Sequence, residues 1–157
     1  MGLDMYLSRR SYVKNWNHNE KKFAVSVQFD GKQHPFINLG NVKYIEEETG
    51  YWRKANAIHN WIIQNIANGE DEFQEIHLTE SELKWLRQDC VSVLGDHSLA
   101  DELLPTTSGF FFGGKDYDEY YFEQLGNTIN IIDNTLVDPD TLPCGIYSPS
   151  YIYQASW

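Results

Sequence analysis

Apolar and polar residues alternate at the start of the chain, a pattern typical of a half-buried β-strand. In residues 3–8 (LDMYLS) the apolar side chains share one face and the remaining side chains share the other. A second alternating segment, residues 22–29 (KFAVSVQF), leads directly into Asp30-Gly31, a dipeptide typical of two-residue hairpin turns. We predict strands in both places. Further strands are predicted over residues 41–48 and 151–157.

The middle of the chain changes to a helical period. A helix of about five turns is predicted to begin at residue 51 and to end at residues 68–69, an Asn-Gly pair. A second helix is predicted from the capping box of Thr79 and Glu82, and a third is predicted to be capped by Asp116 with Glu119. The apolar stripes of the three helices are Ala55, Ile58, Ile62 and Ile66, then Leu83, Leu86, Cys90 and Val93, then Phe122, Leu125, Ile129, Ile132 and Leu136.

The order of these elements predicts the fold class. Strands cluster near both ends and helices fill the middle, so we expect a single α+β domain over residues 1–157. Its antiparallel sheet should include both terminal strands and pack against about three helices.

Composition and charge argue against several classes of protein. Of the 157 residues, 41% are hydrophobic and 15% aromatic, which is typical of a folded chain. The formal charge of -11 opposes general binding to nucleic-acid phosphates and anionic lipids. No apolar run approaches the length of a membrane span, and no secretory leader pattern is seen. With Cys90 and Cys144 as its two cysteines, we expect a cytoplasmic protein with reduced thiols.

Residues 51–61 (YWRKANAIHNW) carry the first candidate site. On the predicted helix, Trp52, Asn56 and His59 form a stripe along one shoulder of the apolar face, and Arg53 lies beyond it towards solvent. An aromatic plane, an amide, an imidazole and a guanidinium suit a polar ligand with a flat ring and a phosphate. The alternative is structural: the tryptophan packs, the histidine binds a carbonyl and the arginine pairs with a nearby carboxylate.

Residues 109–116 (GFFFGGKD) nearly match the phosphate loop of nucleotide hydrolases. That pattern requires Ser or Thr after the lysine, but Asp116 stands there, and three phenylalanines suit a phosphate-wrapping loop poorly. We therefore reject an NTPase of this type. In an extended segment Phe111 would face away from its two neighbours, and Lys115 with the amides opening the third helix would form an anion site.

The spacing of the remaining reactive residues predicts no metal site, no cofactor and no catalytic triad. Ser108 precedes a glycine without the strand-turn-helix signature of a nucleophile elbow. The histidines show no metal-ligand spacing; they are His18, His34, His59, His77 and His97.

Four segments together resemble a family of small phage and prophage proteins: MGLDMYL, YWRKANAIHNW, LLPTTSGFFFG with a later YDEYY, and YQASW. The resemblance spans nearly the whole chain and implies that the functional residues lie in the shared segments. In a compact sheet the terminal strands would pair beside the first helix and build one pocket from four distant segments. Together with Phe111 and Lys115, the expected ligand-binding residues are Asp4, Trp52, Arg53, Asn56, His59, Ser108, Tyr117, Gln154 and Ser156.

Three functions are compatible with these features. The leading hypothesis is a non-catalytic phage accessory protein that counters host defence in the bacterial cytoplasm by sequestering a small nucleotide-derived ligand or immune signal. The first alternative is an acidic inhibitor of a host defence protein, which would mimic DNA through runs such as residues 46–48 and 70–72. The second is a small hydrolase or transferase acting on a nucleotide, with His59 as general base and an acid from residues 116–119. A homo-oligomer fits all three.

Overall fold

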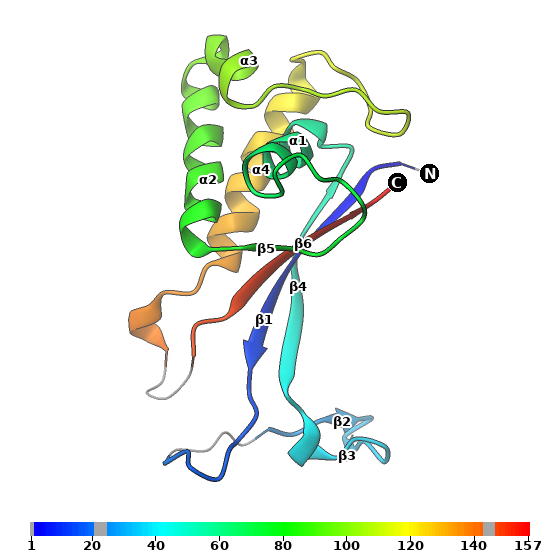
Figure 1. The fold of residues 1–157 in the computed structure, drawn as a ribbon, viewed down its shortest axis with the longest axis vertical. Helices are drawn as coiled ribbons and strands as arrows, with labels where there is room; N and C mark the ends of the chain where they lie inside the picture. The colour runs from blue at the N-terminus through cyan, green and yellow to red at the C-terminus, as the bar shows by residue number, and fades with distance from the viewer. Residues whose placement is uncertain (1, 21–24, 143–146) are drawn as a thin grey trace.

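The two terminal strands lie side by side in the centre of an antiparallel sheet, as the sequence predicts (Figure 1). The computed structural model describes residues 2–20, 25–142 and 147–157. The strand order is β4-β1-β6-β5, and each neighbouring pair is antiparallel. The strands are β1 (Asp4–Tyr12), β4 (Tyr44–Arg53), β5 (Ile76–Leu78) and β6 (Ser150–Ser156).

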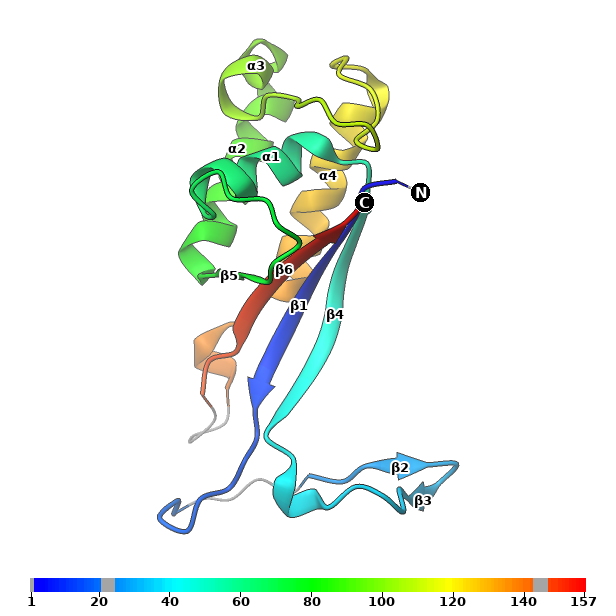
Figure 2. The ribbon, with the colours of Figure 1, turned by 45° about the vertical axis from the view of Figure 1, so that its right-hand side comes forward.

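Helices cover one face of this sheet, and the alternation at the start of the chain explains which face. Leu3, Met5 and Leu7 are fully buried, whereas the polar and tyrosine side chains between them are partly exposed. The helices gather at one end of the molecule, so that the fold belongs to the predicted α+β class (Figures 1 and 2). They are α1 (Asn56–Asn65), α2 (Glu80–Gly95), α3 (Ala100–Leu103) and α4 (Glu119–Thr135), with short 3-10 turns at Leu39–Asn41, His97–Leu99 and Pro139–Thr141.

The second and third predicted helices form where their sequence signals indicate. The Thr79 hydroxyl accepts the backbone N–H of Glu82, whose carboxylate accepts the backbone N–H of Thr79 at 2.7 Å, so the capping box that opens α2 is confirmed. The cap of α4 is Asp118 rather than Asp116. The residues that these helices bury from the predicted stripes are Leu83, Leu86, Cys90, Val93, Leu125 and Ile132.

The first helix begins five residues later than predicted. Residues 51–53 continue β4, where Trp52 pairs with Met5 and Arg53 with Asp4. Lys54 then takes a positive φ of 55°, and α1 starts at Asn56. The prediction was wrong here because the apolar spacing of this segment fits both a strand and a helix. Pairing with β1, which is distant in sequence, decides for the strand.

Beyond Ser150, the first residue of β6, β1 and β4 continue as a two-stranded arm that projects away from the helices (Figure 2). Near its tip, β2 (Gln28–Phe29) and β3 (Lys32–Gln33) form the predicted hairpin, with positive φ angles at Asp30 and Gly31. The predicted strand over residues 22–29 is confirmed only at its last two positions. Residues 25–27 are not in a strand, and residues 21–24 lie outside the described residues, as does Cys144.

Candidate functional site

Part of the predicted site lies on the helix-free face of the sheet. Asp4 pairs in register with Arg53 on one side and with Ser156 on the other, and Gln154 is two residues further along the same face of β6. The amide of Gln154 donates to the carbonyl of Phe73 at 3.2 Å. The terminal strands therefore pair as predicted, but their polar residues point away from α1.

Trp52, by contrast, lies in the core between the sheet and α4. Its indole N–H donates to the hydroxyl of Thr128 at 2.9 Å, and its ring lies 6.5 Å from that of Tyr153 between centroids. Because the side chain is buried, the ring presents no surface on which a ligand could stack. The two faces of the sheet thus separate this residue from the outer polar group, and the four segments do not line one common pocket.

His59 is also buried, with 1% of its surface exposed, and both of its ring nitrogens have protein partners. Nδ1 lies 2.7 Å from the hydroxyl of Tyr153, and Nε2 lies 3.0 Å from a carboxylate oxygen of Asp71. Burial raises the pKa of Tyr153 well above its ordinary value, so this hydroxyl keeps its proton and is hydrogen-bonded to Nδ1. A carboxylate only accepts, so Nε2–H donates to Asp71. Phe112 and Trp157 pack edge-on against the ring, so no nitrogen is left for a general base.

Asn56 holds a loop against the start of α1. Its amide donates to the carbonyls of Phe112 at 3.0 Å and Gly114 at 2.8 Å, and its oxygen accepts the N–H of Thr107 at 3.1 Å. All the hydrogen-bonding capacity of this buried amide except one oxygen lone pair is therefore used within the protein. Its role is to fix the loop of residues 105–117, which contains most of the remaining predicted site.

The three phenylalanines of this loop do not lie as an extended segment would place them. Phe112 is buried against His59, whereas Phe110 is 95% exposed, although the two were expected to share a face. The backbone turns here, because the N–H of Phe112 donates to the carbonyl of Gly109 at 3.1 Å. Phe111 is partly buried, and its carbonyl accepts the N–H of Leu3 at 3.1 Å.

The other predicted residues of the loop are spread along its surface. Ser108 and Lys115 are exposed, and the carbonyl of Lys115 accepts the hydroxyl of Thr106 at 2.9 Å. The hydroxyl of Tyr117 donates to Asp101 at 2.9 Å. An anion site was expected at the N-terminus of the third helix. There the carboxylate of Asp118 accepts the N–H of Tyr121 at 3.0 Å, so a side chain of the protein takes the place of a bound anion at this N–H group.

A cleft of about 220 Å³ opens instead at the start of α1. The first turn of α1 has Ala55 as its N-cap, and no side chain accepts a hydrogen bond there. The first turns of α4 and the Gly113-Gly114 segment form the opposite wall. The residues lining the cleft are Lys54, Ala55, Asn56, Ala57, Ile58, Thr106, Gly113, Gly114, Asp116, Asp118, Tyr120, Tyr121, Gln124 and Leu125.

Two cationic side chains lie together beside this cleft. A Cβ atom on Gly2 would lie 3.3 Å from Cε of Lys54 and 3.7 Å from a guanidinium nitrogen of Arg53, so both side chains flank this glycine. Among the described residues, neither cation forms an ion pair. In a chain with 23 acidic and 12 basic residues, two adjacent cations without an ion pair stand out, although two carboxylates, Asp116 and Asp118, line the cleft beside them.

The cleft contains one of the predicted residues and adds others that were not predicted. Of the predicted set, only Asn56 lines it. Lys54 and Tyr120 were not predicted, although both stand inside segments that the sequence analysis singled out, YWRKANAIHNW and YDEYY. Their proximity to one another could not be read from the sequence, because it depends on how the strand-to-helix junction meets α4.

Comparison with protein-family models, curated proteins and solved structures gives no match for this chain. Within residues 2–20, 25–142 and 147–157, no helix is long and apolar enough to cross a membrane. Over the same residues, no group of three or more His, Cys, Asp or Glu side chains is arranged to hold a metal ion.

Proposed function

We propose that the protein is a phage accessory protein that binds and sequesters a small nucleotide-derived signal in the host cytoplasm, and that the ligand occupies the cleft at the start of α1. The observation that carries this proposal is Lys54, a cation without an ion pair, at the mouth of a cleft beside an uncapped helix start. Backbone N–H groups and the helix dipole favour a phosphate at such a position.

The remaining lining suits the rest of such a ligand. The Asp116 carboxylate is exposed and is suited to accept hydrogen bonds from ribose hydroxyls, a pairing common in nucleotide sites. Tyr120 offers a half-exposed aromatic ring. The cleft of about 220 Å³ is smaller than the roughly 300–1,000 Å³ of sites that enclose a whole drug-sized ligand. It therefore fits a ribose-phosphate portion, with the rest of the ligand lying outside towards Arg53.

Sequestration is favoured over turnover by the state of the catalytic candidates. Both nitrogens of His59 are hydrogen-bonded within the core, and Asp118 caps α4. The DNA-mimic alternative has less support, because its acidic runs are partly neutralised internally. Glu46 pairs with Arg10 and Glu47 with Arg9.

Isothermal titration calorimetry with ADP-ribose, cyclic dinucleotides and cyclic mononucleotides tests the proposal. Lys54→Ala should weaken binding of the active compound about ten- to hundredfold, because it removes a charged hydrogen bond to phosphate. Lys84→Ala, on α2 and away from the cleft, is the matched control and should bind like the wild type. The ligand should be recovered unchanged after the protein is denatured. Absence of heat with every compound, or equal binding by the Lys54→Ala variant, would contradict the proposal.

A further inference from the structure

The projecting arm has no core of its own. Between Leu7 and Gly50, none of the described residues is buried. A two-stranded ribbon is marginally stable in water unless a further strand, a helix or a partner covers one of its faces. The arm is therefore expected to pack against another surface, which would cover one of its faces.

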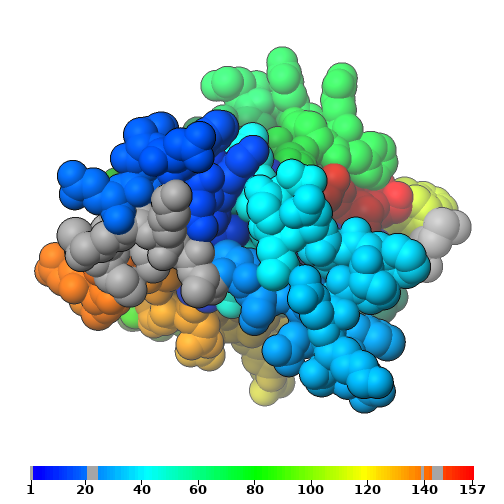
Figure 3. Space-filling view, turned by 90° about the horizontal axis from the view of Figure 1, so that it is seen from below, coloured from blue at the N-terminus to red at the C-terminus, as the bar shows by residue number. Residues whose placement is uncertain are grey.

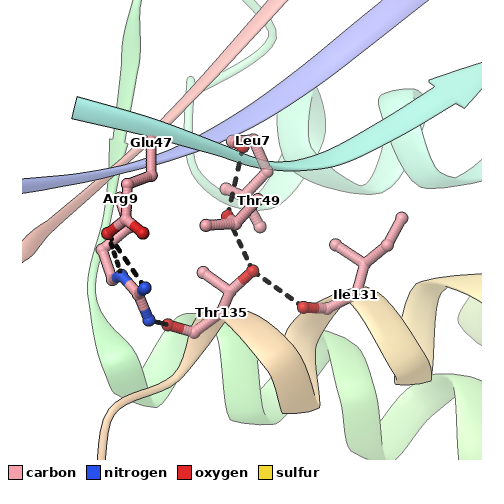
Figure 4. Close-up of polar contacts among 6 residues, drawn as sticks. All are labelled: Leu7, Arg9, Glu47, Thr49, Ile131 and Thr135. Carbon is pink, nitrogen blue, oxygen red and sulfur yellow. Dashed lines mark hydrogen bonds and ion pairs between the residues drawn. The ribbon is translucent and has the colours of Figure 1, made fainter. Parts of the chain in front are cut away.

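The base of the arm is nevertheless fixed to the helical body (Figure 4). Arg9 donates to the carboxylate of Glu47 at 2.9 and 3.0 Å and to the carbonyl of Thr135, at the end of α4, at 3.2 Å. The hydroxyl of Thr49 donates to the carbonyl of Leu7 at 3.2 Å and lies 2.8 Å from that of Thr135. These contacts surround a register shift between β1 and β4 and hold the arm in one direction as it leaves the body.

The tip of the arm exposes aromatic rings and belongs to a basic segment of the chain. Phe29 is 72% and Phe36 90% exposed on the hairpin and the segment after it, which project from the molecule in Figure 3. Residues 11–43 contain five lysines and two acids, a formal charge of +3. The rest of the chain contains seven basic and 21 acidic residues, a formal charge of -14. The whole-chain charge therefore combines a basic segment with a strongly acidic remainder, and the described lysines of that segment are Lys14, Lys32 and Lys43.

The helical body presents a groove with the complementary character. It lies between α1 and α2, has a volume of about 310 Å³ and contains no basic residue among those that line it. Trp85 stands half-exposed in it, edge-on to Trp61 with 4.7 Å between ring centroids. The carboxylates of Asp89 and Glu102 border the aromatic pair. Such a groove suits an apolar ring flanked by lysine.

We propose that the arm tip of one copy docks in the α1–α2 groove of a second copy of this chain. The arm of the second copy docks in the same way in the groove of the first. Phe36 would enter against Trp85, and Lys32 would meet Glu102 across the interface. A reciprocal contact of this kind closes a two-fold dimer and covers both arms. An alternative dimer would pair the edge strands β4 of two copies directly. This pairing is disfavoured, because the three glutamates of residues 46–48 in one copy would lie near those of the other. Nucleic acid is a weaker candidate, since a formal charge of +3 faces -14 on the same molecule.

Sedimentation equilibrium over a range of protein concentrations tests the dimer. Phe36→Ser and Lys32→Glu should each raise the dimer dissociation constant about tenfold or more. Phe110→Ser removes an equally exposed ring outside the arm and should leave it unchanged. Glu102→Lys should weaken the dimer like Lys32→Glu, and combining both changes in one chain should restore it, because each copy then carries the reversed pair.

Three results would overturn the proposal. One is a monomer at all concentrations. Another is a dimer that neither arm variant weakens, or one that Glu102→Lys leaves unchanged. The third is a monomer that retards single- or double-stranded DNA in gels through the arm lysines, which would assign the arm to nucleic acid instead.

Discussion

The hydroxyl of Tyr153 lies 2.7 Å from Nδ1 of His59, so that a hydrogen bond inside the core joins the C-terminal strand β6 to α1. The same imidazole binds Asp71 in the segment between α1 and β5. One buried side chain thereby ties together three parts of the chain, and its position explains why it has no free nitrogen for a ligand.

Removing the Tyr153 hydroxyl should therefore reduce stability. Tyr153→Phe leaves Nδ1 of a buried histidine without its hydrogen-bond partner, which costs about 1–3 kcal/mol of the free energy of unfolding. Urea denaturation followed by circular dichroism measures the effect. Tyr147→Phe removes an exposed tyrosine hydroxyl and serves as the control. Equal stability of the two variants would show that the core hydrogen bond contributes little.

Asn56 should control the order of the loop that forms one wall of the cleft. Asn56→Ala removes three hydrogen bonds and leaves the carbonyls of Phe112 and Gly114 without their donor, at a cost of about 2–4 kcal/mol. Amide hydrogen exchange should rise in residues 105–115 more than in α2. Asn127→Ala on the exposed side of α4 is the control and should change neither quantity by much. A variant with an unchanged exchange pattern would contradict the assigned role.

Two glycine-to-alanine changes should have opposite signs. At Gly50 a Cβ atom would lie 2.3 Å from Cγ2 of Ile131, so Gly50→Ala should destabilise the protein by about 1–3 kcal/mol through overpacking of β4 against α4. At Gly126, inside α4, no atom other than the neighbouring backbone of the helix lies within 4 Å of the added carbon, so Gly126→Ala should stabilise by about 0.5–1 kcal/mol through helix propensity.

The contact at Gly50 can be isolated with a double variant. Gly50→Ala combined with Ile131→Ala should lose less stability than the sum of the two single changes, because Ile131→Ala removes Cγ2, the atom that the added carbon would meet. Strict additivity in chemical denaturation would count against a direct contact between these residues.

Cys90 should be unreactive in the folded protein. Burial raises the pKa of this thiol to about 12, so the nucleophilic thiolate is scarce at pH 8. In a Cys144→Ser background, a thiol-specific disulfide reagent should modify Cys90 in denaturant and leave it intact in buffer. Rapid modification of the native variant at pH 8 would show that the α2–α4 contact opens readily.

The same thiol predicts a direction for stability at alkaline pH. Its folded pKa lies above the value of about 8.5 expected in the unfolded chain. The contribution is therefore fully present below about pH 8.5 and is lost as the pH rises towards 12. Cys90→Ala should lose less stability than the parent protein between pH 8 and pH 10, as measured by urea denaturation.

Several elements could be predicted because a few neighbouring residues determine them. The alternation of Leu3, Met5 and Leu7 predicts a strand with one buried face. Asp30-Gly31 predicts a hairpin turn, because both residues tolerate the positive φ that the turn requires. Thr79 with Glu82 predicts the start of α2, because the capping box is closed within one helical turn.

Only the tertiary structure decided where the residues of the first candidate site lie. Trp52 is in β4 and not in a helix, because the backbone of β1 offers it a partner that the local sequence does not contain. His59 and Asn56 carry polar groups typical of binding sites, yet their partners come from β6 and from the loop before α4. Local patterns thus determined the elements and the buried face, whereas contacts between segments distant in sequence determined which polar groups are satisfied inside the protein and which, like Lys54, form no ion pair among the described residues.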